Sequence, residues 1–369
     1  DGFLYRAETV ELDLRGHVRS ITDRRGVVIG AIATDRLGRP VHTASVDSGH
    51  RWVLLDASNK PVLVWKGEDD ATEPSFIVKT GYDELERPVR VDVTSSNSPV
   101  HADGDFCSSF IVYGESLPTA TAQASNLLGR PVRQYDASGL AMTTEVDFKG
   151  NVTESRRRIA LKWDVSPDWG TVALETDVAG WDAEQAASLE ATEYVSTATF
   201  DALNRVFEAT TPAESGRPAS TTFTEYDRGG RLKSTSIALR WAGTSPPEIG
   251  DAEPAIVDIT YNARGQRVSM TAALDDDVND DAQSLRRTYE YDIQTFALVR
   301  VISERLDDEG APASTIQDLT YTCDPVGNVA RIADAAQQTV FFANTVVSPD
   351  RTFAYDALYR LTEATGREH

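Results

Sequence analysis

Aspartates recur along the whole chain and are the residues best suited to chemistry. Paired carboxylates can act as acid and base in hydrolysis, and runs of them can bind Ca²⁺. The acidic runs 275–277 and 280–281 suit a cation by composition. However, an EF-hand loop needs Gly at its sixth position and Glu at its twelfth, and neither pattern is present. Because most other aspartates hold one fixed place in a repeated phrase, we favour a role in turns over catalysis.

Other reactive residues show no pattern of a known site. None of the histidines forms an HxxxH or HExxH pair of the kind that binds zinc. The segment Gly114-Glu115-Ser116 is not a nucleophile elbow, because Pro118 stands where G-x-S-x-G needs its second Gly. We therefore expect no catalytic residue, no metal and no cofactor. The scattered histidines are His17, His42, His50, His101 and His369.

The two cysteines, Cys107 and Cys323, are too few for a disulfide framework or a metal cluster. Cys323 occupies the strand-end position that Tyr fills in other copies of the phrase, which predicts a small buried side chain.

The repeated phrase reads aromatic or apolar residue, Asp, two variable residues, Gly or a polar residue, then Arg, Asn or Lys. Residues 226–231, Tyr-Asp-Arg-Gly-Gly-Arg, are a clear copy. Aromatic residues pack well in strands. The Asp side chain can accept a hydrogen bond from the backbone N–H two residues on, and Gly allows the reversal with φ > 0. Each copy therefore predicts a strand end, a turn and the start of the next strand.

The residues assigned to these turns come from nine copies. A further variant copy begins at Leu55, and looser copies begin at Leu12 and Tyr291. The assigned turn residues are Asp35, Gly38, Arg39, Tyr82, Asp83, Arg87, Tyr135, Asp136, Gly139, Asp147, Gly150, Phe200, Asp201, Arg205, Tyr226, Asp227, Gly230, Arg231, Tyr261, Asn262, Gly265, Asp324, Gly327, Tyr355, Asp356 and Arg360.

The spacing of the copies predicts the architecture. Closely following copies start roughly 21 to 35 residues apart, the length that two strands and two short connections need. One hairpin alone is marginal in water, so neighbouring hairpins must pair edge to edge. We predict an all-β fold, a long antiparallel sheet with few short helices and no compact three-dimensional core.

The chain is predicted to form one repeat segment, 1–369, with irregular insertions near 101–134 and 152–199. Within the first insertion, the Ala-rich stretch 119–128 favours a helical turn or two. Within the second, Asp182 as N-cap with Gln185 three residues on predicts a helix over 182–193. Three stretches rich in Pro, Gly or acidic residues are predicted to be solvated hairpin tips. They are 245–247, 275–281 and 307–312.

Charge and hydropathy exclude several partners. The net charge is −22, which opposes binding to nucleic acid or to an anionic membrane surface. No apolar run approaches the ~20 residues that a spanning helix needs. We expect neither a nucleic-acid nor a membrane partner.

Longer stretches carry a more specific resemblance. The strongest spans 324–342, 355–361 and 363–369, and shorter ones are 112–118, 126–130 with 134–140, and 147–151. These segments resemble the C-terminal, shell-forming part of the B component of bacterial Tc insecticidal toxin complexes, within the RHS or YD repeat family.

The resemblance implies a non-enzymatic structural role in a secreted or extracellular toxin. In that family the repeats wind as a curved, spiralling sheet into a hollow shell that the C component completes. The shell encloses the cytotoxic C-terminal region of the C component and passes it to the pore-forming A component. The N-terminal propeller that docks on the pore, and the C-terminal partner, are expected to lie outside this chain. Open sheet edges would then let the fragment associate with itself.

Two other functions compete with this one. Trp and Tyr side chains on one solvent face would suit a carbohydrate-binding or adhesion module, although we expect most of them to pack within the sheet. A hydrolase is the other alternative. The segment 324–327, Asp-Pro-Val-Gly, is similar to the DPxG element of the self-cleaving protease found at the end of the C component. It occupies an ordinary repeat position, so we do not assign it that role.

Overall fold

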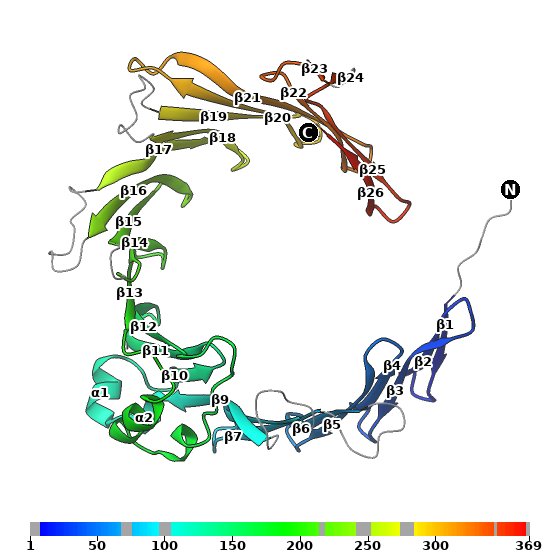
Figure 1. The fold of residues 1–369 in the computed structure, drawn as a ribbon, viewed down its shortest axis with the longest axis vertical. Coiled ribbons are helices and arrows are strands. Elements are labelled where there is room, and N and C mark those ends of the chain that lie inside the picture. Colours follow the sequence, from blue (N-terminus) through cyan, green and yellow to red (C-terminus); the bar gives the residue numbers. More distant parts are fainter. Residues whose placement is uncertain are drawn as a thin grey trace. The chain divides into compact units, whose positions relative to one another are not determined.

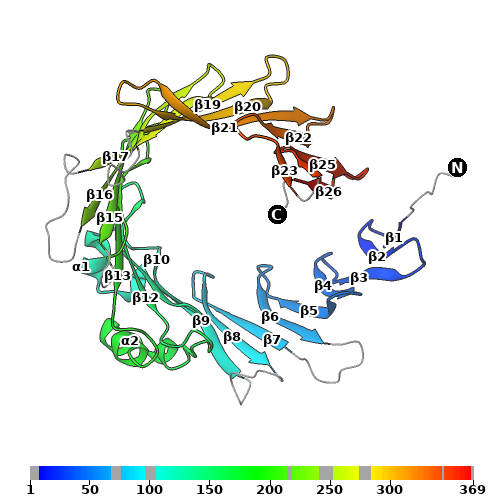
Figure 2. The same ribbon diagram turned by 45° about the horizontal axis from the view of Figure 1, so that its top comes forward.

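A computed structural model describes residues 8–67, 76–95, 105–213, 218–240, 252–273, 284–342 and 345–366. The chain divides into two compact units, Asp1–Ser196 and Thr197–His369. Each unit is a strip of hairpins that follow one another in chain order (Figure 1). Within unit 2 the strip is curved in both views (Figures 1 and 2).

Strands dominate both units, and the helices are short. The strands are β1 (Thr9–Leu12), β2 (Val18–Thr22), β3 (Val28–Thr34), β4 (Pro40–Ser45), β5 (Gly49–Leu55), β6 (Pro61–Gly67), β7 (Phe76–Tyr82), β8 (Pro88–Ser95), β9 (Asp105–Tyr113), β10 (Pro131–Asp136), β11 (Gly139–Val146), β12 (Val152–Ile159), β13 (Tyr194–Phe200), β14 (Val206–Thr210), β15 (Ala219–Tyr226), β16 (Leu232–Arg240), β17 (Glu253–Tyr261), β18 (Arg267–Ala273), β19 (Ser284–Tyr291), β20 (Leu298–Leu306), β21 (Pro312–Cys323), β22 (Val329–Asp334), β23 (Val340–Phe342), β24 (Thr345–Val347), β25 (Arg351–Tyr355) and β26 (Leu361–Thr365). The helices are the 3-10 turns η1 (Gly114–Ser116) and η2 (Val172–Leu174) and the α-helices α1 (Thr119–Ala124) and α2 (Val178–Gln185).

The sheet confirms the predicted all-β antiparallel architecture. Twenty-four strands belong to one sheet, and β23 with β24 forms a separate hairpin. Antiparallel pairing follows chain order, as between β7 and β8 or β19 and β20, and β22 pairs with β25 across the separate hairpin. Among the described residues, β1 pairs only with β2 and β26 only with β25, so the sheet is not closed.

Strict chain-order pairing gives each unit two distinct rims. Successive connections between antiparallel strands fall alternately on the two ends of the strands. We call one end the repeat rim. In unit 1 it carries the connections β1–β2, β3–β4, β5–β6, β7–β8, β9–β10 and β11–β12, and in unit 2 it carries β13–β14, β15–β16, β17–β18, β19–β20, β21–β22 and β25–β26. We call the other end of the same strands the opposite rim.

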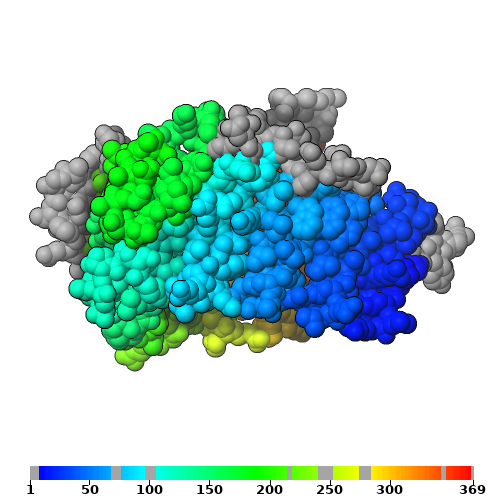
Figure 3. Space-filling model, turned by 90° about the horizontal axis from the view of Figure 1, so that it is seen from below, coloured from blue at the N-terminus to red at the C-terminus, as the bar shows by residue number. Residues whose placement is uncertain are grey.

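Most of the sheet is a single layer. The chain exposes 24289 Å², whereas a compact monomer of 40.3 kDa exposes about 14,500 Å². Most described strand residues are only partly buried, because no second layer of described residues packs on them. Figure 3 shows one face of unit 1, where successive strands follow one another from blue to green.

One region of unit 1 departs from this single layer, and the prediction of no compact core is wrong there. The segment between β12 and β13, with α2 and η2, packs on the sheet and buries a hydrophobic cluster. Trp169 and Trp181 are fully buried in it, against Tyr135 and Leu140 of the sheet. The core forms where an insertion is long enough to supply a second layer.

The predicted helices are partly right. The Ala-rich stretch 119–128 contains α1, as expected. The helix predicted over 182–193 runs instead over Val178–Gln185, and the side chain of Asp177 caps it by accepting a hydrogen bond from the Gly180 N–H. Asp182 lies inside this helix and binds Arg133 of β10 at 2.8 Å. Asp182 is not the cap because the helix begins four residues earlier, where Asp177 holds its first turn.

The burial predicted for Cys323 is wrong: the side chain is exposed, whereas Cys107 is buried. Cys323 ends β21, where the sheet is one layer thick and nothing covers a strand-end side chain. His101, His369 and the predicted loops 245–247 and 275–281 lie outside the described residues. The loop at 307–312 is a tight turn between β20 and β21, as predicted.

Candidate functional site: the repeated turn

The repeat phrase forms one hydrogen-bonded turn, and Asp227 illustrates it. The Gly230 N–H donates to the Asp227 carbonyl at 3.0 Å, and the Asp227 N–H donates to the Arg231 carbonyl at 2.8 Å. The Asp227 carboxylate accepts from the Arg231 N–H through Oδ1 and from Arg231 Nε through Oδ2. Backbone and side-chain donors therefore converge on one carboxylate, which fixes the reversal and the direction of the next strand.

In most of these turns the residue three positions after the Asp or Asn adopts the left-handed conformation, whereas in the looser copy at Asp292 it is Phe296, four positions on, with φ 61°. Gly230 has φ 79° and Gly265 has φ 82°. In four turns another residue type takes this place. These residues are Asn59, Glu86, Asn204 and Tyr359, with φ between 60° and 68°. L-residues with a side chain are strained there, so the hydrogen bonds of the turn must hold them in place.

The turn carboxylates are bound as anions. The Arg205 side chain, together with the Arg205 backbone N–H, lowers the pKa of Asp201. The Asn328 side chain lowers the pKa of Asp324 in the same way. Asp324 accepts hydrogen bonds from the backbone of Val326 and Asn328 and from Asn328 Nδ2. Asp324 thus has the contacts of the other turns, and these contacts occupy its carboxylate.

Where a Tyr ends the first strand of a repeat-rim hairpin, its hydroxyl links that hairpin to the preceding one. The Tyr226 hydroxyl donates to the Val206 carbonyl at 2.9 Å, and the Tyr261 hydroxyl donates to the Leu232 carbonyl at 2.8 Å. The same bond joins Tyr82 to Pro61, Tyr113 to Pro88, Tyr291 to Arg267 and Tyr355 to Val329. In each pair the acceptor is the residue five positions after the preceding turn Asp or Asn. Sequence reasoning assigned these Tyr rings to packing and missed the hydroxyl.

The Arg that closes the turn also contacts the next hairpin. The guanidinium of Arg205 lies 4.2 Å from the centre of the Tyr226 ring, and Arg231 lies 4.7 Å from that of Tyr261. Such cation–π contacts are worth about 0.5–1 kcal/mol at exposed sites. In unit 1, Arg39 Nη1 donates to the Asp56 carbonyl at 3.0 Å. One Arg therefore closes its own turn and joins it to its neighbour along the repeat rim.

At two places on the repeat rim, residues other than Gly and Asp make these contacts. Glu86 has replaced Gly in its turn, and its carbonyl accepts from Lys60 Nζ at 2.9 Å. Between β9 and β10 no Asp follows Tyr113. Instead Glu115 accepts from the Gly129 N–H at 2.9 Å and pairs with Arg87 at 3.3 Å. Glu115 was not singled out in the sequence because its partners lie 14 and 28 residues away.

The assigned turn residues fall on the repeat rims, with one exception. Asp35, Asp83, Asp147, Asp201, Asp227, Asn262, Asp324 and Asp356 each accept from the backbone N–H two residues on. The copy at Tyr135 lies on the opposite rim, beside the buried cluster. There Asp136 pairs with Arg157 at 2.9 Å and the Tyr135 hydroxyl donates to Gln185. A side chain on Gly139 would lie 2.3 Å from the Arg158 carbonyl, so this Gly is required by close packing.

One complete turn was not predicted from the sequence. Asp23 makes the same hydrogen bonds with Arg25, Gly26 and Val27, on the opposite rim of unit 1. Residues 23–27 are highly charged and follow Thr22 rather than an aromatic residue, so they did not match the phrase.

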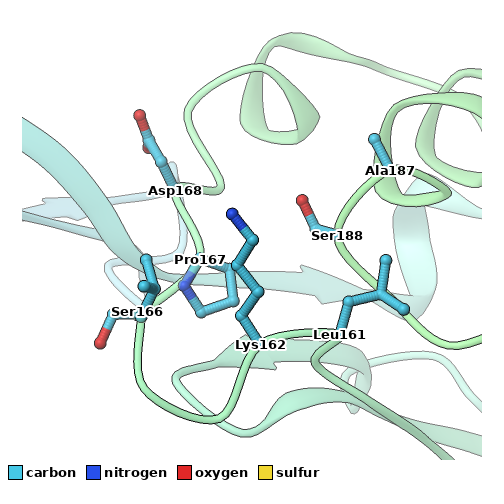
Figure 4. Close-up of a pocket in the computed structure, with 8 residues that line it drawn as sticks. Leu161, Lys162, Ser166, Pro167, Asp168, Ala187 and Ser188 are labelled. Atoms are coloured by element: carbon cyan, nitrogen blue, oxygen red, sulfur yellow. The ribbon is translucent and has the colours of Figure 1, made fainter. Parts of the chain in front are cut away.

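Cavities in the described residues offer no catalytic set. Figure 4 shows one of about 240 Å³ in the covering segment of unit 1, with the amine of Lys162 near Ser188. The carboxylate of Asp168 at its edge is held by the backbone N–H groups of Cys107 and Gly170. Among the described residues, no group of three His, Cys, Asp or Glu side chains could hold a metal ion. Within the same residues, no helix is long and apolar enough to span a bilayer.

The fold and the turn together define a class: an open antiparallel sheet assembled from hairpins with an Asp-based turn. No family model matches the chain. Toxin subunit YenC2 of Yersinia entomophaga is 29% identical over 371 residues, covering 97% of this chain and 35% of the relative. Toxin subunit YenC1 of the same organism is 28% identical, covering 90% of this chain and 30% of the relative. The chain thus spans about a third of the length of the curated relatives it matches.

Solved structures show the same fold. The crystal structure of TcdB2-TccC3 superposes with a TM-score of 0.76 at 23% identity, covering 98% of this chain and 16% of the matched chain. The Photorhabdus luminescens Tc holotoxin pore gives a TM-score of 0.75 at 23% identity, covering 98% of this chain and 15% of the matched chain. These similarities confirm the resemblance to Tc toxin subunits that the sequence indicates.

Proposed function

We propose that the chain is a non-enzymatic wall segment of a hollow β-shell in a bacterial Tc-type toxin complex. The observation that carries this proposal is the single-layer, open sheet, which matches the TcdB2-TccC3 crystal structure over 98% of the chain. The shell would enclose the cytotoxic C-terminal region of the C component. Residues 1–369 act as one wall segment in this proposal, although they form two compact units.

The physics of the sheet suits a container wall. A layer one sheet thick exposes both faces, so one face can line a volume while the other contacts solvent. Such a layer has no opposing sheet to keep it rigid. The Tyr and Arg contacts along the repeat rim supply stiffness, because each ties a hairpin to its neighbour.

The partners and location follow from this proposal. The C component would complete the shell and supply the cargo, and the pore-forming A component would receive it. The sequence resemblance points to the B component, whereas the curated relatives are named YenC2 and YenC1. A wall role is the same for either subunit. As part of a released toxin the chain would be secreted or extracellular, and its open edges β1 and β26 would be sites of self-association.

A carbohydrate-binding module is the alternative, and few observations favour it. Trp163 is almost fully exposed, but Trp169 and Trp181 are buried. Trp52 and Trp65 stack on each other at 5.9 Å, with His42 and His50 on the far side of Trp52. Among the described residues, the tryptophans therefore do not form an open platform for a sugar.

Protection of the cargo tests the proposed function. The protein is co-expressed with the partner subunit that would complete the shell, and the purified complex is treated with a broad protease. We expect a closed particle whose enclosed region resists digestion until the complex is denatured. A cargo digested as fast as the free polypeptide would refute the wall role. Glycan-array binding that is lost in Trp163→Ala would favour the adhesion module instead.

A further inference from the structure

Four rings stack on one face of unit 1, across β4, β5 and β6. His42 is opposite Trp52 in the strand register, and Trp52 is opposite Trp65. The centre of the Trp52 ring lies 4.8 Å from that of His42 and 5.9 Å from that of Trp65. His50 stands two positions before Trp52 on β5, and its ring centre lies 5.0 Å from that of His42. All four side chains are half-buried, so the rings shield one another from water.

A direct hydrogen bond joins the two histidines of this stack. His42 Nε2 lies 2.8 Å from His50 Nδ1. One of these nitrogens must carry a hydrogen and the other must accept it. The bond therefore forms when both rings are neutral or when one of them is protonated. It cannot form when both are protonated, because each nitrogen then carries a hydrogen and the two rings repel each other as like charges.

The surroundings of the pair disfavour a second proton. Burial lowers the pKa of His42, and the neighbouring charge of His50 lowers it further. β3, which pairs with β4, contains no titratable residue. On β5 and β6 the charged residues Arg51 and Lys66 stand opposite each other on the other face of the sheet. The two strands that flank the β4–β5 hairpin therefore supply no described carboxylate to stabilise a doubly charged pair.

Two further charged residues border the stack. Lys79 of β7 lies on the same face, opposite Leu63 of β6, and its positive charge opposes further protonation. Asp47 lies in the connection between β4 and β5, where its N–H donates to Ser45 Oγ at 3.4 Å. Asp47 is exposed, and a solvated carboxylate contributes little to a charge pair. Neither residue offsets the repulsion between two protonated rings.

We propose that the His42–His50 pair is an acid-sensitive clasp on the β4–β5 hairpin. Its hydrogen bond holds the two strands together on this face near neutral pH, and protonation of both rings breaks it and releases them from Trp52. Beside His50 lies a cavity of about 160 Å³ lined mostly by small and apolar residues, so the ring has space to turn away. This inference goes beyond the proposed function and does not rest on it, since one hairpin opens without a shell or a cargo.

The direction of the pH effect follows from the linkage of protonation to folding. In an unfolded chain the pKa of His is about 6.5, and the pKa of His42 in the folded protein is lower. The open hairpin therefore binds more protons than the closed one. Its stability should be complete above about pH 6.5 and should fall as the pH drops from there toward the folded-state pKa. The turn carboxylates of Asp201 and Asp227 stay ionised in this window, because their pKa values lie below 3.8.

Native-state hydrogen exchange of the protein at pH 7 and pH 5 tests the clasp, once each rate is corrected for the intrinsic pH dependence of amide exchange. The readout is the ratio of opening at pH 5 to opening at pH 7. We expect a ratio of at least about three for the amides of β4 and β5. The amides of β17 and β18, two strands without histidine, should give a ratio of about one. His17 lies 3.1 Å from the Asp13 carboxylate, so its protonation preserves that contact.

Two variants locate the acid effect. His42→Gln and His50→Asn place an amide, which does not titrate, at the positions of Nε2 and Nδ1. The ratio for β4 and β5 should fall to about one in His42→Gln, which lacks the buried titrating ring. It should fall below the wild-type ratio in His50→Asn, because a protonated His42 can still donate to the Asn oxygen and has no charged neighbour.

Three results would overturn the clasp. They are a wild-type ratio of about one, a wild-type ratio retained in His42→Gln, and a wild-type ratio retained in His50→Asn. The last result would assign the acid effect to burial of His42 alone. Because each ratio compares one variant with itself, a hairpin weakened equally at both pH values still decides the question. Wild-type exchange of β17 and β18 shows that each variant has folded.

The clasp and the wall role can fail separately. Protection of the cargo is measured at pH 7, where the clasp is closed. A digested cargo would leave the clasp untouched, and a hairpin that ignores acid would leave the wall role untouched.

Discussion

Replacement of Gly265 by Ala isolates the backbone strain of the repeated turn. Gly265 has φ 82°, and a Cβ built on it meets nothing within 4 Å. The substitution therefore adds no clash, and it keeps the Gly265 N–H bond to the Asn262 carbonyl. The only cost of the substitution is that Ala disfavours the left-handed conformation. The loss of stability in the variant therefore measures how strongly the turn requires that conformation.

The expected cost follows from two opposing effects. Holding an L-residue in the left-handed region costs about 1–2 kcal/mol. Replacing Gly by Ala lowers the conformational entropy of the unfolded chain, which stabilises the folded state by about 0.4–1 kcal/mol. The net destabilisation should be about 1 kcal/mol. Since 1.4 kcal/mol is tenfold in an equilibrium, local opening of this hairpin should become about fivefold more frequent.

Native-state hydrogen exchange is the suitable assay, because a repeat sheet opens locally and a global unfolding midpoint averages over many hairpins. Amides of β17 and β18 should exchange about fivefold faster in Gly265→Ala. Gly30→Ala is the matched control: Gly30 lies inside β3 without a positive φ, and its nearest atom is 3.9 Å away. Exchange around Gly30 should be unchanged or slower. The reasoning fails if Gly265→Ala leaves the exchange of its hairpin unchanged.

Three further substitutions or titrations probe other contacts. Tyr226→Phe removes the hydroxyl that binds the Val206 carbonyl, which should destabilise this hairpin by about 1 kcal/mol and speed hydrogen exchange at the start of β14. Tyr289→Phe, whose hydroxyl makes no repeat contact, should leave that exchange unchanged. Hydrogen bonds from Arg205 and Arg231 lower the pKa of Asp201 and Asp227 below 3.8. The stability that these two turns contribute should therefore be complete above pH 3.8 and should be lost as the pH falls through the folded-state pKa. Loss of the turns already near neutral pH would contradict this. Burial raises the pKa of Cys107 to about 11, so maleimide at pH 7 should modify Cys323 and spare Cys107 in the native protein, and equal rates would show that the unit 1 core is open.

The local turn could be predicted from sequence, but its long-range contacts could not. Asp, Gly and Arg at fixed offsets determine one reversal, because all of those bonds fall within four residues. The hydroxyl of Tyr226 reaches an acceptor 20 residues back, and the partners of Glu115 lie 14 and 28 residues away. Such contacts depend on which strands pair, which a local phrase does not encode.

Other differences have separate physical reasons. Tyr135 follows the phrase but lies on the opposite rim, because rim position depends on counting every preceding strand. Asp182 has the spacing of a helix cap, but its carboxylate binds Arg133 of β10, which lies 49 residues away. Only the packing of α2 on the sheet brings these two residues together. The core requires an insertion that folds back onto the sheet, and apart from Trp169 and Trp181 nothing in the local sequence predicts that return.

The Tyr hydroxyl that reaches back by a single hairpin makes the wall modular in length. Six described hairpins have such a bond, and each of these bonds reaches back by one hairpin and no further. A duplication of one whole hairpin would extend the strip by about 9.5 Å and leave the register of every other pair intact. Loss of a single strand would instead move every later turn to the other rim. Under the proposed function, the size of the container would change in steps of one hairpin.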